Sequence, residues 1–150
     1  PLSIYRAKAT GGLETGKTFA ICNDESNALR ALELLKAKGV INNIPVDKDG
    51  KLTMVGANWT ADNGVKVTLI SEELLVSSMN DYDFVCLPCN TALTGNVDAS
   101  LKVAKEDQPE LVSGKANVLA ARVDDYNNDE IYKNKIHVLT NALLSKEVSD

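Results

Sequence analysis

The sequence predicts an α/β domain in which a mostly parallel sheet is flanked by helices. Two observations lead to this class. Apolar runs of strand length alternate with amphipathic runs of helix length, and the strand-like run Thr18–Cys22 leads into the helix-like run Glu25–Lys38. This alternation favours parallel pairing, because a helical crossover returns the chain to the edge where the next strand begins. Ligands bind outside the carboxyl ends of the strands in such sheets, so a site is expected there.

The first part of the chain supplies two strands and a long helix. Leu2–Tyr5 and Thr18–Cys22 are short apolar runs, and the loop Ala9–Lys17 between them is polar and rich in glycine. The helix Glu25–Lys38 follows residues that cap helices well, and it ends before Gly39, which suits a C-cap. The apolar residues at helical spacing form its expected core face: Ala28, Leu29, Ala31, Leu32, Leu34 and Leu35.

The middle of the chain continues the alternation after an irregular stretch at Asn42–Gly64. Val65–Ile70 alternates as a strand, and Glu72–Met79 suits a short helix. Tyr82–Leu87 reads as a buried strand, and Pro88–Leu93 suits the beginning of another helix.

The last third contains one ambiguous segment and two clearer ones. Leu101–Val112 has no decisive pattern, Ala116–Val123 predicts a long apolar strand, and Asp129–Lys146 predicts a final helix. The apolar face of that helix is expected to consist of Ile131, Ile136, Leu139 and Leu143.

Composition limits the classes of function. The chain of 150 residues is long enough for one domain with a single core, and 44% hydrophobic and 25% charged residues are ordinary for a globular protein. A formal net charge of -5 argues against bulk binding to nucleic acid or to an anionic membrane. No apolar run has the length of a membrane span, and the first residues lack a signal-peptide pattern.

The most informative polar residues lie where the strand Thr18–Cys22 passes into the helix. Helix N-termini attract anions through their N–H groups and through the helix dipole. Arg30 lies one turn into the helix, and a free guanidinium at that place suits a carboxylate or a phosphate. The sequence therefore predicts a small-anion pocket at the carboxyl end of this strand.

Three asparagines fall on the same predicted edge of the sheet. Asn27 lies in the first turn of the helix, and Asn90 follows a strand and a proline. Asn117 opens the predicted strand Ala116–Val123 and would lie at this edge if that strand runs antiparallel. Each asparagine alone is more often structural, but together with Arg30 they predict a set of polar ligand contacts.

Two motifs suggest other chemistry. Gly11–Thr18 matches the Walker A pattern letter for letter, but that loop needs a helix directly after it, and here a strand follows. We interpret it as a turn before a strand. Cys86 and Cys89 form a C-x-x-C pair, but Cys86 belongs to a strand and is expected to point inward, which argues against redox chemistry.

Metal and acid–base chemistry find little support in the sequence. A zinc site needs about four ligands, and the chain offers a single C-x-x-C pair and a single histidine, His137. No pair of carboxylates stands out as an acid and a base. We therefore expect a binding protein with no catalytic residues, no metal and no cofactor.

The residues around Arg30 also resemble a known family. Asn23–Leu32 (NDESNALRAL) with Lys38–Ile41 (KGVI) is similar to the NDPTN..RAL...GLI signature of NlpA/MetQ-type lipoproteins, the substrate-binding proteins of methionine ABC importers. Four further segments resemble other parts of that family in the same order: Pro1–Ile21, Val65–Ser78, Asp83–Thr91 and Gly114–Ala120.

The resemblance implies a fold and a function. The fold is a periplasmic-binding-protein-like (type II) lobe, and residues 1–150 would be a single solute-binding lobe of a two-lobed architecture. Arg30 would clamp the ligand α-carboxylate, and Asn27, Asn90 and Asn117 would contact its amino and carboxylate groups. The ligand would be an amino acid such as methionine or a short peptide. The partner would be an ABC permease, and the protein would be extracytoplasmic and lipid-anchored.

Two alternatives remain open from the sequence. One is an α/β enzyme that uses Cys89 as a nucleophile at the strand edge, for which a lowered thiol pKa would be the sign. The other is a degenerate lobe that acts as a protein-interaction module, for which a large exposed apolar face would be the sign.

Overall fold

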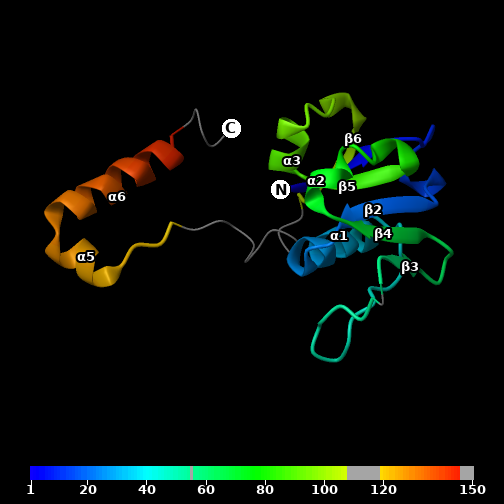
Figure 1. Ribbon diagram of the computed structural model, residues 1–150, viewed down its shortest axis with the longest axis horizontal. Coiled ribbons are helices and arrows are strands. Elements are labelled where there is room, and N and C mark those ends of the chain that lie inside the picture. The colour runs from blue at the N-terminus through cyan, green and yellow to red at the C-terminus, as the bar shows by residue number, and fades with distance from the viewer. Residues whose placement is uncertain (55, 108–118, 146–150) are drawn as a thin grey trace. The chain divides into compact units, whose positions relative to one another are not determined.

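The computed structural model describes residues 1–54, 56–107 and 119–145. They divide into two units, Pro1–Gly114 and Lys115–Asp150, which are described separately (Figure 1).

A six-stranded sheet in the order β3-β4-β2-β5-β1-β6 organises the first unit. Its strands are β1 (Leu2–Arg6), β2 (Thr18–Cys22), β3 (Asn58–Thr60), β4 (Lys66–Ile70), β5 (Phe84–Pro88) and β6 (Lys102–Lys105). β2 pairs in parallel with β4 and β5, whereas β1 is antiparallel to β5 and β6, and β3 is antiparallel to β4. Four of the six strands therefore point in one direction, which confirms the predicted mostly parallel sheet.

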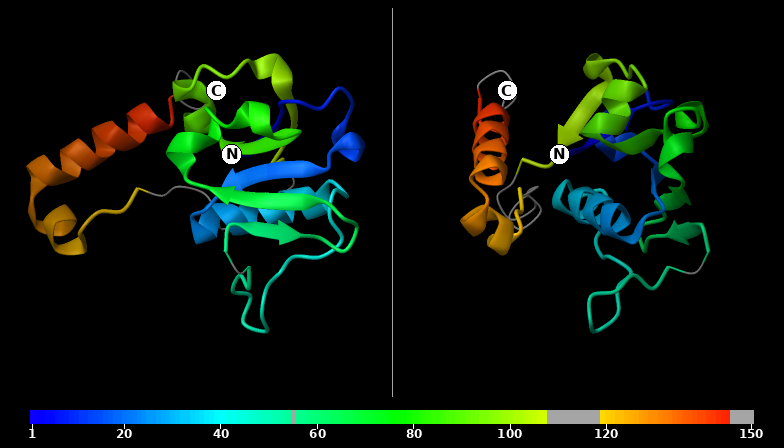
Figure 2. Two further views of the ribbon diagram at one scale, coloured as in Figure 1. Left: turned by 45° about the vertical axis from the view of Figure 1, so that its right-hand side comes forward. Right: turned by 60° about the vertical axis from the view of Figure 1, so that its left-hand side comes forward.

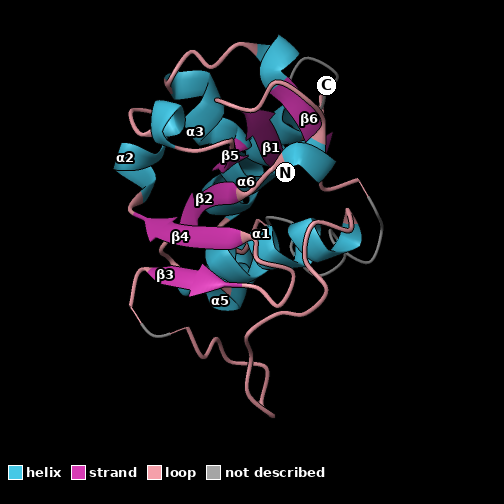
Figure 3. Cartoon of the chain, turned by 90° about the vertical axis from the view of Figure 1, so that its right-hand side faces the viewer, coloured by secondary structure: helices cyan, strands magenta, loops and turns pink. Residues whose placement is uncertain are grey.

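Helices cover both faces of this sheet (Figures 2 and 3). α1 (Glu25–Ala37) packs on one face, and α2 (Glu72–Leu75) and α3 (Cys89–Thr94) pack on the other. The described residues of this unit also form three 3-10 turns: Leu13–Thr15, Met79–Asp81 and Ala99–Leu101. Each face of the sheet has its own hydrophobic core. Alternate residues of each central strand pack into one core or the other, because successive side chains of a strand point to opposite faces. In β2, for example, Phe19 and Ile21 face α1, and Ala20 and Cys22 face α2 and α3.

The predicted helix after Cys22 is confirmed as α1. The Asp24 side chain caps it by accepting a hydrogen bond from the backbone N–H of Asn27 at 2.9 Å. After the helix, Gly39 takes a φ of 72°, a left-handed conformation that glycine adopts without strain. Five of the six expected core residues are buried, but Leu29 is only half-buried, because it lies beside the stripe that faces the sheet.

Two strands and part of a helix differ from the sequence expectation. β3 lies inside the segment Asn42–Gly64 that was expected to be irregular, and β6 lies inside the ambiguous segment Leu101–Val112. Both are short edge strands with polar residues, so neither forms an apolar run. The helix expected over Glu72–Met79 ends at Leu75 as α2, and the chain then turns into the 3-10 turn Met79–Asp81.

In the described part of the second unit, residues 119–145, the structure has the helices α5 (Val123–Asn128) and α6 (Glu130–Leu143). The strand predicted over Ala116–Val123 is wrong in its described part, because residues 119–122 are exposed without strand pairing and Val123 begins α5; its first three residues lie outside the described part of the chain. The predicted final helix is confirmed as α6, which Asp129 caps through the N–H groups of Ile131 and Tyr132.

The apolar face of α6 lies largely in solvent. Ile131, Leu139 and Leu143, which the sequence places on the apolar face of this helix, are exposed. Among the helices that the structure describes, neither α6 nor any other has the length and hydropathy of a membrane span.

Candidate functional site

The carboxyl ends of four strands meet at one edge of the sheet in the first unit. Asn23, Ser71, Cys89 and Glu106 are the residues that directly follow β2, β4, β5 and β6. Backbone hydrogen bonds tie this edge together, since the N–H of Asn23 donates to Ile70 at 2.9 Å and the N–H of Glu106 donates to Leu2 at 2.9 Å. The helices α1, α2 and α3 all begin at this edge, as the sequence predicts for a ligand site in a parallel sheet.

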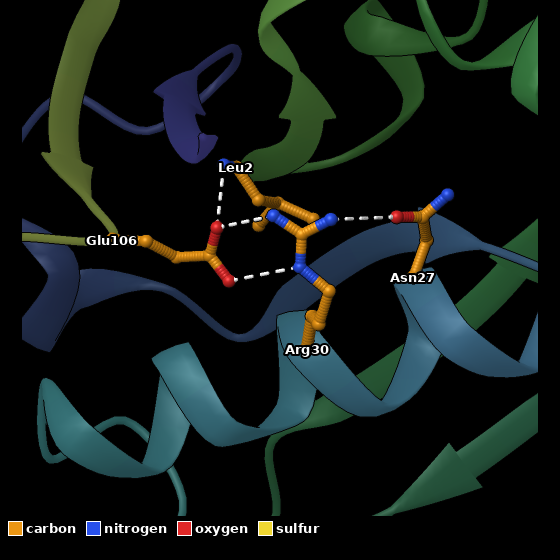
Figure 4. A network of polar contacts seen from close by, with 4 residues as sticks. All are labelled: Leu2, Asn27, Arg30 and Glu106. Atoms are coloured by element: carbon orange, nitrogen blue, oxygen red, sulfur yellow. Dashed lines mark hydrogen bonds and ion pairs between the residues drawn. The ribbon is translucent and has the colours of Figure 1, made fainter. Parts of the chain in front are cut away.

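Arg30 and Glu106 form the strongest polar contact at this edge (Figure 4). Arg30 Nε donates to Glu106 Oε1 at 3.1 Å, and Arg30 Nη2 donates to Glu106 Oε2 at 2.5 Å. The two parallel hydrogen bonds make a bidentate pair, which fixes the plane of the guanidinium. The sequence alone suggested a free guanidinium. In the structure, however, the guanidinium is already paired with a carboxylate from the end of β6.

Glu106 is a buried carboxylate with partners from two elements. The residue is 4% exposed, and its Oε2 also accepts the backbone N–H of Leu2 at 2.7 Å. Burial of a carboxylate is costly unless hydrogen bonds and an opposite charge compensate, and Arg30 and Leu2 supply both here. Sequence reasoning missed Glu106, because it lies in the ambiguous segment and its partner Arg30 is 76 positions away.

Glu106 strengthens the preference of Arg30 for its charged form. Hydrogen bonding to Glu106 raises the pKa of the guanidinium, against a smaller opposing effect of burial, and the charges of Glu106, Glu33 and Asp24 raise it further. Arg30 thus stands in an acidic environment, although its own side chain is 24% exposed and in reach of solvent.

Asn27 is the third member of the network. Its Oδ1 accepts a hydrogen bond from Arg30 Nη1 at 3.3 Å, one turn earlier on α1. The structure therefore brings two of the four predicted site residues, Asn27 and Arg30, into contact (Figure 4).

Of the other two predicted site residues, the structure describes Asn90. Asn90 lies in α3, exposed, directly after the end of β5 and so at the same edge of the sheet as Arg30. Asn117 lies outside the described residues. A ligand-binding role for Asn27, Arg30, Asn90 and Asn117 stays a prediction.

The Walker A match is a turn before a strand, as interpreted from the sequence. Lys17 leads into β2, and α1 begins only at Glu25. The carboxylate of Asp83 holds the turn, because it accepts the N–H groups of Lys17 and Thr18 at 2.8 and 2.9 Å and the Thr18 hydroxyl at 3.0 Å. Burial alone would raise the pKa of Asp83, but these hydrogen bonds outweigh it and lower the pKa below its usual value.

The cysteines occupy contrasting places. Cys86 is fully buried in the core beneath α1, and burial raises the pKa of its thiol to about 12. Cys89 is exposed as the first residue of α3, and both thiols are free.

In the second unit, His137 Nε2 lies 3.0 Å from the hydroxyl of Tyr126. Within the described ranges, no three His, Cys, Asp or Glu side chains gather as a metal site would require.

Several solved structures share this fold, among them the following three. A putative lipoprotein from Ruminococcus gnavus ATCC 29149 is 22% identical, with a TM-score of 0.69, over 98% of this chain and 59% of its own. A substrate-binding protein of a methionine transporter from Streptococcus pneumoniae is 18% identical, with a TM-score of 0.69, over 99% of this chain and 58% of its own. A nutrient-binding protein from Burkholderia cenocepacia, solved with methionine bound, is 24% identical, with a TM-score of 0.69, over 99% of this chain and 60% of its own.

These likenesses show the fold, a type II periplasmic-binding-protein-like lobe, and this chain spans about three fifths of the length of these structures. No curated protein matches the chain significantly. The family model described as NlpA lipoprotein matches residues 1–150, the whole of the chain. The resemblance carried by Asn23–Leu32 is thereby confirmed, and the chain belongs to the NlpA lipoprotein family.

Proposed function

We propose that residues 1–150 form one solute-binding lobe of a two-lobed extracytoplasmic lipoprotein, and that this lobe binds an amino acid such as methionine or a short peptide. An ABC permease in the membrane would receive the solute, and the lobe itself would perform no chemistry. Membership of the NlpA lipoprotein family supports the proposal, as do the structural relatives from Streptococcus pneumoniae and Burkholderia cenocepacia whose names refer to methionine.

The observation that carries the proposal is the way Arg30 is held at the carboxyl edge of the sheet. A guanidinium has five N–H donors, and it can bind a carboxylate bidentately along either of two edges. Glu106 takes the Nε/Nη2 edge, and Asn27 accepts one N–H of Nη1. Glu106 and Asn27 thus account for three donors, and the edge between Nη1 and Nη2 suits a second carboxylate, that of the solute.

The asparagines complete the proposed contacts. Asn27 would share its amide between Arg30 and the solute, and Asn90 would approach from the start of α3. Amides can donate to a carboxylate and accept from an ammonium group, which suits both ends of a zwitterionic amino acid.

The test is a thermal-shift screen of the chain against the standard amino acids and methionyl dipeptides, followed by calorimetry of any solute that stabilises it. A ligand at about 100 times its dissociation constant adds roughly 2.7 kcal/mol of stability. Arg30→Ala should abolish the shift, whereas Arg122→Ala, which removes an exposed arginine at the start of α5, should leave it unchanged. A shift that survives Arg30→Ala would contradict the assigned site, and the absence of any shift would favour a protein partner over a small solute.

A further inference from the structure

Glu106 is a buried acid placed against the cation that the proposed function needs. Its carboxylate faces Arg30 with both oxygens and also accepts the N–H of Leu2 at 2.7 Å (Figure 4). Its own backbone N–H donates to the carbonyl of Leu2 at 2.9 Å, so both its main chain and its side chain are fixed to the start of β1. A carboxylate fixed in this way is a rigid support and is poorly suited to swing out when a ligand arrives.

The support determines which edge of Arg30 remains for a ligand. Arginine loses much rotamer freedom when it is ordered, and a partner that orders it beforehand reduces the cost of binding. With Nε and Nη2 held by Glu106 and Nη1 held by Asn27, the guanidinium has one orientation before any solute binds. Groups that orient a binding residue from behind commonly contribute tenfold or more to affinity, as second-layer partners of metal ligands do.

The same carboxylate changes the charge that a ligand meets. The Arg30 cation is balanced by Glu106 in direct contact, and Asp24 and Glu33 also act on it electrostatically. A solute that carries only a carboxylate would bring a further negative charge into this acidic environment. A solute that also carries an ammonium group would offset that repulsion.

We propose that Glu106 is the positioning residue of the Arg30 site, and that it sets the preference of the site for a zwitterionic solute over a simple carboxylate anion. Glu106 holds the guanidinium along its Nε/Nη2 edge, next to the Nη1/Nη2 edge proposed for the solute, and does not touch the solute itself. This inference rests on the proposed function, and its test separates the two.

Four variants of the chain test the inference. Glu106→Gln keeps the size of the side chain but removes its charge and places an amide N–H₂ group against the donors of Arg30 or Leu2. Glu106→Asp keeps the charge but is one methylene too short to reach both partners. Asp107→Asn is the matched control, because it removes a neighbouring carboxylate that pairs instead with Lys38 at 3.2 Å. Arg30→Ala reports on the proposed function itself.

Two measurements are made on each folded variant. The first is the hydrogen exchange of the Arg30 Nε–H group, followed by nitrogen-15 NMR without ligand. The second is the affinity for two probes, L-methionine and its deaminated analogue 4-(methylthio)butanoate, which differ only in the ammonium group. The ratio of the two affinities measures the charge preference and is insensitive to a general loss of stability.

We expect Glu106→Gln to speed the exchange of the Arg30 Nε–H group and to lower the affinity for L-methionine by about tenfold or more. It should also reduce the preference for L-methionine over the analogue. Glu106→Asp should weaken binding but keep the preference, and Asp107→Asn should change none of the three quantities.

Unchanged exchange, affinity and preference in Glu106→Gln, with binding lost in Arg30→Ala, would overturn the role of Glu106 alone. Binding that survives Arg30→Ala would overturn the proposed site instead. If the chain binds neither probe, the exchange measurement decides: faster exchange in Glu106→Gln supports positioning, and unchanged exchange refutes it.

Discussion

Phe19 and Phe84 stack across the join between β2 and β5, with ring centroids 5.2 Å apart and an angle of 17° between the ring planes. The two residues are register partners of neighbouring parallel strands, and both are fully buried beneath α1. Gly16 closes this stack at the end of the preceding loop, since a Cβ atom there would lie 2.7 Å from Phe19 and 2.8 Å from Phe84. Gly16, the last glycine of the false Walker A motif, thus has a packing role.

Gly16→Ala should therefore destabilise the fold by about 1–3 kcal/mol, the usual cost of overpacking a well-filled core. Urea denaturation gives the free energy of unfolding. Gly12→Ala is the matched control from the same loop, because its added Cβ would meet only the movable carboxylate of Glu14. Equal stabilities of the two variants would show that the rings move aside without cost.

The pair Arg30–Glu106 should also contribute far more to stability than the neighbouring pair Lys38–Asp107. Glu106 has a side chain that is 1% exposed, whereas that of Asp107 is 48% exposed, so water screens the second pair. Double-mutant cycles with Arg30→Met and Glu106→Gln, and with Lys38→Met and Asp107→Asn, measure each coupling. We expect about 2 kcal/mol for the first pair and below about 1 kcal/mol for the second. Similar couplings would indicate that water also screens Glu106.

The strands that the sequence predicted correctly are those in the middle of the sheet. In β1, β2 and β5 four of five residues are buried, and in β4 all residues but Lys66 are buried or half-buried. Such positions favour the apolar residues that identify these strands in the sequence. β3 and β6 lie at the two edges and carry the polar residues that edge strands tolerate, so no periodic pattern marks them. The incorrect strand at residues 119–122 shows the converse, because an apolar run forms a strand only where a partner strand accepts it.

The site was predictable only in its local part. Arg30 and Asn27 lie one turn apart on one helix, and the cap at Asp24 identifies that helix from the sequence. Glu106 could not be found in the same way, because nothing near it in the sequence indicates that the end of β6 meets α1. Contacts between distant segments depend on strand order, and the order β5-β1-β6 follows from tertiary packing.

The stability of the first unit should fall at acidic pH partly through Asp83. Its pKa is lower in the folded chain than in the unfolded chain, because folding supplies hydrogen bonds from Lys17 and Thr18. The unfolded state therefore binds the proton more tightly, so the contribution of Asp83 is complete above a pH of about 4 and is lost as the pH falls through the folded pKa.

Denaturation of wild type and Asp83→Asn between about pH 6 and pH 2 measures this contribution. The variant should be less stable at neutral pH and should lose less stability on acidification. Thr18→Val removes one of the three hydrogen bonds to the carboxylate, together with the bond that the hydroxyl accepts from the Asp83 N–H, and keeps a β-branched strand residue; it should give an intermediate slope. Parallel curves for wild type and Asp83→Asn would show that Asp83 does not cause the acid sensitivity.

Thiol labelling of the native chain should distinguish the two cysteines of the C-x-x-C pair. Cys89 is exposed, so iodoacetamide should label it, whereas Cys86 is buried with a thiol pKa of about 12 and should react only after unfolding. Mild oxidation should leave the two thiols unlinked, since Cys86 points into the core under α1 and Cys89 begins α3 on the other face of the sheet. Mass spectrometry of the labelled peptides reads both outcomes. Labelling of Cys86 in the native state, or a disulfide between the pair, would support the redox interpretation. Loss of solute binding in Cys89→Ser would show that Cys89 belongs to the binding site.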